Sequence, residues 1–138
     1  MKMDEIIKKY IIDELRFISN MMKESDDLLD SIFYFSAAYG VFDKVMRQNY
    51  SEYLLFTEEV LQLSYIQLSN FSQDIKLQSI IKDIDIKATL KEIASNLNEI
   101  AIAIENDRDY IDNLIKIKAL AYQFTAPGIY LKKRFATK

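Results

Sequence analysis

Residues 86–104 read "IKATLKEIASNLNEIAIAI" and carry the clearest periodicity in the chain. Six apolar side chains recur at intervals of 4, 3, 4, 3 and 4 residues: Ile86, Leu90, Ile93, Leu97, Ile100 and Ile104. This spacing keeps side chains on one stripe of an α-helix, the stripe that a coiled coil or a long bundle helix buries. Ala94 and Ala101 lie beside it and permit a close approach. The stretch therefore predicts a helix over about 86–105 that packs lengthwise against other helices.

Helical periodicity continues through most of the chain. The other expected amphipathic helices cover about 3–23, about 26–48, a stretch from about 50, a short stretch of about 73–83 before a bend near Asp83 to Asp85, and about 107–124. Only two glycines and one proline occur in 138 residues, which disfavours a β-sandwich or barrel because those folds need frequent turns.

These segments predict an all-α fold, an up-and-down antiparallel bundle of four long helices plus one short helix. Proline cannot continue a helix, so we expect Pro127 to end the last one. The bundle would form a single domain over residues 1–128, and a short basic tail would follow over 129–138.

The helix expected over 26–48 is apolar on two sides. One side carries Leu28, Ile32, Phe35, Tyr39, Phe42 and Met46. The nearly opposite side carries Tyr34, Ala37, Ala38, Val41 and Val45, with Gly40 also in mid-helix. A helix that is apolar almost all round is usually buried on both sides. The second side is therefore either covered within the monomer or is an interface with a second copy or another partner, and we take it as the candidate interaction surface.

The absence of two residue types restricts the chemistry available to the protein. The chain contains no histidine and no cysteine. This excludes Ser-His-Asp and Cys-His catalysis, zinc sites built on those residues, and di-iron sites that need Glu-x-x-His. No glycine-rich phosphate-binding motif occurs. We therefore expect a protein without a cofactor that acts through protein–protein contacts and forms a homodimer.

Carboxylates leave one enzymatic alternative, a small Mg²⁺-dependent phosphate-ester or nucleotide hydrolase. Asp26 and Asp30 belong to a D-D-x-x-D pattern, and Asp109 and Asp112 form a second acidic group. A metal ion between the two groups would require their helices to be adjacent. The simpler interpretation is capping, because acids in a first helical turn are favourable to the helix dipole. Ser25 and Asn106 are the expected caps.

The end of the chain is basic although the net charge is −3. Lys132, Lys133, Arg134 and Lys138 fall within the last ten residues, which contain no acid. A nucleic-acid-associated accessory protein that contacts its partner through this tail is a second alternative. A solvated terminus is the simpler interpretation, and an acidic protein overall makes nucleic acid a less favoured partner.

The N-terminal stretch "MKMDEIIKKYIIDEL", residues 1–15, carries charges every few residues. It lacks the uninterrupted apolar core of a signal peptide, and no run of 18 apolar residues occurs. From the sequence we expect a cytoplasmic protein with no membrane partner.

Overall fold

The structure, a computed structural model, describes residues 3–81 and 84–135. These residues form seven helices and no strand, so the all-α class is confirmed. The helices are α1 (Glu5–Glu24), α2 (Leu28–Gln48), α3 (Glu52–Gln73), α4 (Ile75–Ile80), α5 (Ile86–Glu105), α6 (Ile111–Tyr122) and α7 (Ala126–Phe135).

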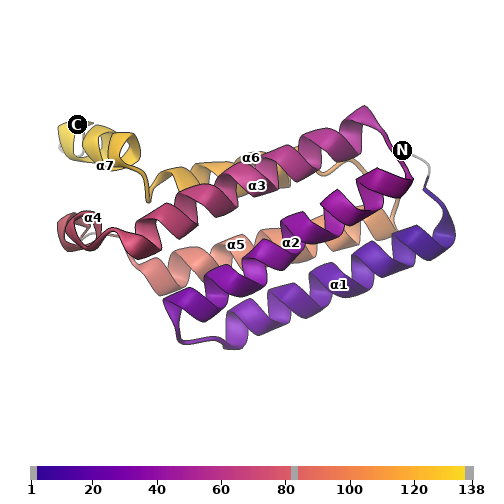
Figure 1. Cartoon of the computed structure of the whole chain (residues 1–138), viewed down its shortest axis with the longest axis horizontal. Coiled ribbons are helices and arrows are strands. Elements are labelled where there is room, and N and C mark those ends of the chain that lie inside the picture. The colour runs from indigo at the N-terminus through magenta and orange to yellow at the C-terminus, as the bar shows by residue number, and fades with distance from the viewer. Residues whose placement is uncertain (1–2, 82–83, 136–138) are drawn as a thin grey trace.

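The helices α1, α2, α3, α5 and α6 lie side by side as a bundle, with α4 and α7 at one end (Figure 1). Around the bundle, α1 packs against α2 and α5, α3 packs against α2 and α6, and α6 closes the ring against α5. Consecutive long helices run in opposite directions, as an up-and-down bundle requires. The α3–α6 pair is parallel instead. The rings of Tyr53 and Tyr110 meet near the start of both helices, and the rings of Phe71 and Phe124 meet near the end of both.

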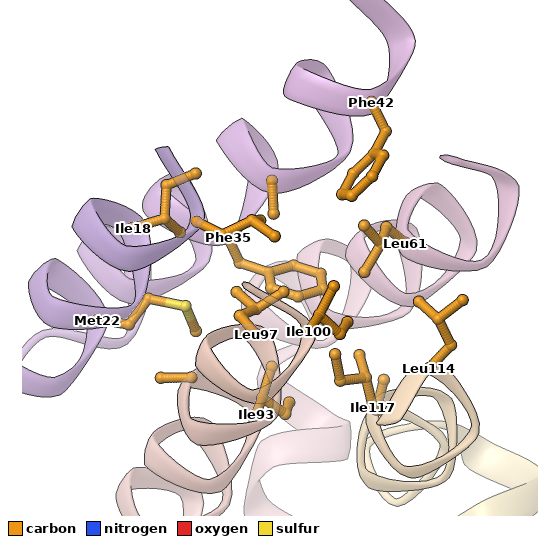
Figure 2. Close-up of a cluster of buried hydrophobic side chains, with 14 of the residues drawn as sticks. Ile18, Met22, Phe35, Phe42, Leu61, Ile93, Leu97, Ile100, Leu114 and Ile117 are labelled. Carbon is orange, nitrogen blue, oxygen red and sulfur yellow. The ribbon is translucent and has the colours of Figure 1, made fainter. Parts of the chain in front are cut away.

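Helix α5 lies at the centre of the core. Ten of its residues are buried, compared with seven on α2, and it contacts α1, α2 and α6. Figure 2 shows Ile93, Leu97 and Ile100 pointing toward side chains from the surrounding helices, among them Phe35 and Leu61. The 4,3,4,3,4 stripe is therefore the central packing surface of the bundle, because it meets neighbours along the whole helix.

The N-caps of α2 and α6 differ from the sequence-based expectation. Asp27, not Ser25, is the N-cap of α2, because α1 continues to Glu24 and Ser25 closes it. Ser51 caps α3 through a 3.0 Å bond from the Leu54 amide to its hydroxyl oxygen.

The start of α6 is displaced further, from about 107 to Ile111. Asn106 does not cap α6 but ends α5, and Asp107 follows with a φ of 52°. The Asp107 amide donates to the Ile104 carbonyl and the Arg108 amide to the Ala103 carbonyl. These are the two bonds of a Schellman motif, here with aspartate in the left-handed position that glycine usually takes. The motif turns the chain away before a new helix can begin.

The C-terminal segment is a helix where a tail was expected. Pro127 lies in the first turn of α7, where a missing amide hydrogen costs nothing, so the same proline that follows α6 also starts α7. The Gly128 amide donates to the Thr125 hydroxyl at 3.1 Å, and Ile129 is buried. A Cβ at Gly128 would collide with the Tyr122 carbonyl, so only glycine fits there.

The expected helix count is therefore too low for the described part of the chain. Four helices have 20 to 22 residues, as expected. The stretches expected over about 73–83 and about 107–124 correspond to α4 (6 residues) and α6 (12 residues), whereas α7 (10 residues) was not expected. Helix α4 is also shorter than the predicted 73–83. A bend was predicted near Asp83 to Asp85, and the chain bends at Ile84; Asp83 itself and the tail residue Lys138 lie outside the described residues.

Candidate interaction surface

The five residues predicted as an interaction patch on α2 do not share one accessible face. Ala38, Val41 and Val45 are at most 5% exposed, whereas Tyr34 is half-buried and Ala37 is exposed. The physical reason is that α2 contacts three helices, α1, α3 and α5, so its buried side covers more than half of its circumference. Both apolar sides inferred from the sequence belong largely to the core, and this corrects the predicted patch.

A different set of α2 residues faces outward. Leu29 is 60% exposed and Phe33 is 67% exposed, and Ala37 and Gly40 are exposed in the same direction. Their spacing of four, four and three residues places them within about 80° of one another around the helix. We call Leu29, Phe33, Ala37 and Gly40 the outer row. Two large apolar side chains and two small residues thus form a stripe that no other helix in the described part of the chain covers.

Gly40 has no structural reason within the chain to be glycine. Apart from its chain neighbours and the nearby backbone of α2, a Cβ built there would meet no atom of the described residues within 4 Å, and no described glycine has a positive φ. Glycine inside a helix costs about 1 kcal/mol relative to alanine. The small size of residue 40 is therefore not used by the folded monomer, although it weakens the helix.

Charged residues stand at both ends of the outer row. Asp26 and Asp30 lie at the start of α2, and Lys44 and Arg47 lie in its last turns. Asp26 is 3.6 Å from Lys87, and Arg47 is 3.0 Å from Asp43 on its own helix. The Lys44 ammonium lies 4.9 Å from the centre of the Tyr10 ring. Exposed pairs of this kind contribute little, so these groups remain accessible to other charges.

Phe17 of α1 extends the apolar surface sideways, because α1 lies next to α2 (Figure 1). It is 56% exposed and stands between Tyr10 and Met21 at helical spacing. Tyr10 meets Lys44 of α2, and Met21 borders a hollow together with Tyr34 of α2. Phe17 therefore lies on the side of α1 that faces α2.

The two acidic groups considered for a metal ion lie at opposite ends of the bundle. Asp26 is near Lys87 at the start of α5, whereas Asp109 follows the end of α5. A helix of this length spans about 30 Å. In the described part of the chain, no group of three or more acidic residues is placed to hold a metal ion. One ion between the two groups, as the hydrolase alternative requires, does not fit this geometry.

Most of the carboxylates in these groups act on the helix ends. Asp27 accepts a bond from the Leu29 amide at 3.0 Å, and Asp109 accepts one from the Ile111 amide at 2.8 Å. Asp30 and Asp112 lie in the first turns of α2 and α6. Negative charge at these positions stabilises a helix through its dipole.

A polar network that the sequence did not reveal joins α3 to the start of α6. The Tyr53 hydroxyl donates to Asp109 at 2.7 Å and accepts from the Tyr110 amide at 3.0 Å, and the Tyr110 hydroxyl lies 2.8 Å from the Thr57 hydroxyl. Burial, together with the nearby Asp109 carboxylate, raises the pKa of Tyr53 to about 12, and burial also raises that of Tyr110. A small hollow of about 110 Å³ borders the network at Lys8. Since each of these hydroxyls bonds a group on the neighbouring helix or at its start, they stabilise the fold.

An apolar groove of about 380 Å³ runs between α3 and α6. Phe56 and Val60 form one wall, and Ile115 and Tyr122 form the other, with Lys118 stacked 5.3 Å over the Tyr122 ring. The sequence did not predict this groove, because it depends on which helices become neighbours.

The basic residues predicted at the C-terminus lie on α7. Lys132, Lys133 and Arg134 are all exposed, as are the neighbouring Tyr130 and Phe135. The Arg134 guanidinium lies 5.3 Å from the Phe135 ring. The expected mixture of cations and aromatic rings is therefore on the surface, held on a helix.

Comparison with protein-family models, curated proteins and solved structures found no match for this chain. In the part of the chain that the structure describes, no helix has both the length and the apolarity needed to cross a membrane.

Proposed function

We propose that this protein is not an enzyme and acts through protein–protein contacts, associating with a second copy of itself through the outer row of α2. The observation that carries the proposal is the exposure of Phe33 and Leu29 beside Gly40, whose small size the monomer does not use. Covering a large apolar side chain is worth about 1.5–3 kcal/mol, so this stripe favours a partner. A contiguous apolar surface of this kind is typical of an interface.

The remaining polar chemistry supports an enzyme less well. Without histidine or cysteine, catalysis would depend on carboxylates and hydroxyls. The acidic groups lie at opposite ends of the bundle. The Tyr53 hydroxyl bonds Asp109 and the Tyr110 amide, and the Tyr110 hydroxyl bonds the Thr57 hydroxyl. These arrangements favour stability over turnover.

Sedimentation velocity over a range of concentrations tests the proposal. We expect the sedimentation coefficient of the wild-type protein to rise with concentration and that of Phe33→Asp to stay at the monomer value. Ile115→Asp is the matched control, because Ile115 is also a largely exposed apolar residue but lies on α6. We expect this control to associate like the wild type. A wild-type protein that remains monomeric at every concentration contradicts the proposal.

The basic face of α7 supports a second candidate function, contact with single-stranded nucleic acid. Lys133 and Arg134 stand beside exposed Tyr130 and Phe135, and cations with aromatic rings are the combination that such contacts use. The double variant Lys133→Glu/Arg134→Glu tests it in a gel-shift assay with a labelled oligonucleotide. Retention by the wild type and its loss in the variant would support this candidate, and unchanged retention would remove it.

A further inference from the structure

The residue types along the outer face of α2 are arranged so that this face is complementary to an antiparallel copy of itself. From the start of the helix to its end it presents acids (Asp26, Asp30), large apolar residues (Leu29, Phe33), small residues (Ala37, Gly40) and bases (Lys44, Arg47). Acids and bases occupy opposite ends, and the large and small residues occupy opposite halves of the outer row. A second copy that runs in the opposite direction would therefore place unlike groups opposite one another.

We infer that two copies pair their α2 helices antiparallel, about a two-fold axis that passes beside Ala37. This inference rests on the proposed self-association and specifies its geometry. A two-fold interface uses the same patch on both copies, so residues equally far from the axis face one another. The midpoint of Phe33 and Gly40 falls between residues 36 and 37, beside Ala37, so these two residues become partners across the axis.

The outer row would form the apolar centre of this interface, and this accounts for its large and small residues. Phe33 of each copy rests over Gly40 of the other, where the monomer leaves open space above the helix. Ala37 meets Ala37 at the axis. Because the distance between two packed helices depends on the side chains at their crossing, alanine and glycine allow the helices to approach closely. The ring of Phe33 then fills the space that a larger residue at position 40 would occupy.

The charges favour the same direction. Asp30 and Lys44 each lie seven residues from Ala37, so each Asp30 faces a Lys44 of the other copy. Asp26 and Arg47, at the two ends of the face, are brought together in the same way. A parallel pair would instead set Asp30 against Asp30, Lys44 against Lys44 and Phe33 against Phe33. Like charges opposite one another oppose association, so electrostatics select the antiparallel arrangement.

Cysteine cross-linking tests the geometry cleanly, because the native chain contains no cysteine. The variants Asp30→Cys and Lys44→Cys leave the apolar centre intact. Their positions are about 21 Å apart along one helix, whereas a disulfide joins Cα atoms about 4.4–6.8 Å apart. We expect an oxidised mixture of the two variants to form a disulfide-linked dimer, and each variant alone to form none. Ile115→Cys, mixed with either one, is the control that should not cross-link.

The possible outcomes separate this inference from the proposed function. A dimer formed by Asp30→Cys alone indicates a parallel pair and overturns the inference, while self-association stands. A mixture that sediments as a dimer without cross-linking also overturns the geometry. A mixture that sediments as a monomer overturns both, and the outer row would then belong to a different partner.

Charge exchange provides an independent test that needs no cysteine. Lys44→Asp places two acids opposite one another at each end of the interface, and we expect dimer formation to weaken by roughly tenfold. Adding Asp30→Lys restores opposite charges with their positions exchanged, and dimer formation should recover. A double variant that associates no better than Lys44→Asp, with an unchanged melting temperature, would overturn the proposed pairing.

Discussion

The two faces of α2 have similar composition and opposite environments. On the inner face, Phe35, Ala38 and Phe42 are fully buried among the neighbouring helices. On the outer face, Leu29 and Phe33 are mostly exposed beside Gly40, where an added Cβ would meet open space among the described residues. Hydrophobic residues alone therefore do not define a core, because their coverage depends on where the other helices lie. The uncovered face is then the natural place for a partner.

The largest expected difference between the faces comes from removing one ring from each. Phe35→Ala should lower the free energy of unfolding by about 3–5 kcal/mol, because it leaves a cavity at the centre of the bundle. Phe33→Ala should change it by less than about 0.5 kcal/mol in dilute, monomeric protein. Urea denaturation at low protein concentration measures both values. Equal losses in the two variants would mean that the outer face is packed within the monomer.

Enlarging two adjacent alanines should produce the next largest difference. Ala38→Leu should lower the free energy of unfolding by about 1–3 kcal/mol, because its extra atoms must enter a filled core. Ala37→Leu faces outward and should leave the monomer nearly unchanged while weakening self-association. Urea denaturation gives the first effect and sedimentation gives the second. A tolerated leucine at position 38 would contradict the packing described for α2.

A smaller effect of opposite sign is expected at Gly40. Gly40→Ala should raise the free energy of unfolding of the monomer by about 0.5–1 kcal/mol, because alanine favours the helix and its methyl group meets open space. The same methyl group should weaken dimer formation. Thermal unfolding of dilute protein, compared with sedimentation, separates the two effects. A variant that destabilises the dilute monomer would show that the glycine serves an internal contact.

The smallest expected effect concerns Glu58, a buried residue of α3 near Asp43 of α2. Burial of Glu58, with Asp43 of α2 and Glu59 nearby, raises the pKa of the Glu58 carboxyl. A raised pKa means that ionisation costs more in the folded state, so stability falls as the pH rises through the ordinary glutamate range. Glu58→Gln should therefore raise the melting temperature slightly at neutral pH, and the gain should vanish in acid.

The neighbouring acid provides the matched control for Glu58. Glu59 is exposed, so Glu59→Gln should give a smaller change in the melting temperature at neutral pH. If Glu58→Gln lowered the melting temperature at neutral pH, the carboxylate would be making a favourable interaction, and the assigned cause of its raised pKa would be wrong.

Local patterns predicted most of the helices correctly. The stripe on α5 needs only one helix to be recognised, and its bounds of about 86–105 match Ile86–Glu105. The start of α6 was missed because Asp107 adopts a left-handed conformation that glycine usually takes. Helix α7 was missed because Pro127 is compatible both with the end of one helix and with the start of the next.

The candidate surface could be predicted only in part, for a different physical reason. Periodicity shows that α2 is apolar almost all round, but it does not show which neighbours cover each side. Contacts with α1, α3 and α5 bury Ala38, Val41 and Val45, whereas the outer row, which includes Ala37, stays uncovered. The apolar groove between α3 and α6 depends in the same way on which helices become neighbours around the bundle, because it forms where these two helices pack in parallel.

Hydroxyl-radical footprinting of the unmodified protein at increasing concentration shows whether a second copy covers the outer row of α2. If a second copy covers the outer row of α2, oxidation of Phe33 should fall as the concentration rises, while oxidation of Ile115 on α6 stays constant. Phe35 should be protected at every concentration, because its cover comes from the same chain. Oxidation of Phe33 that does not change with concentration would contradict the claim that this face joins two copies.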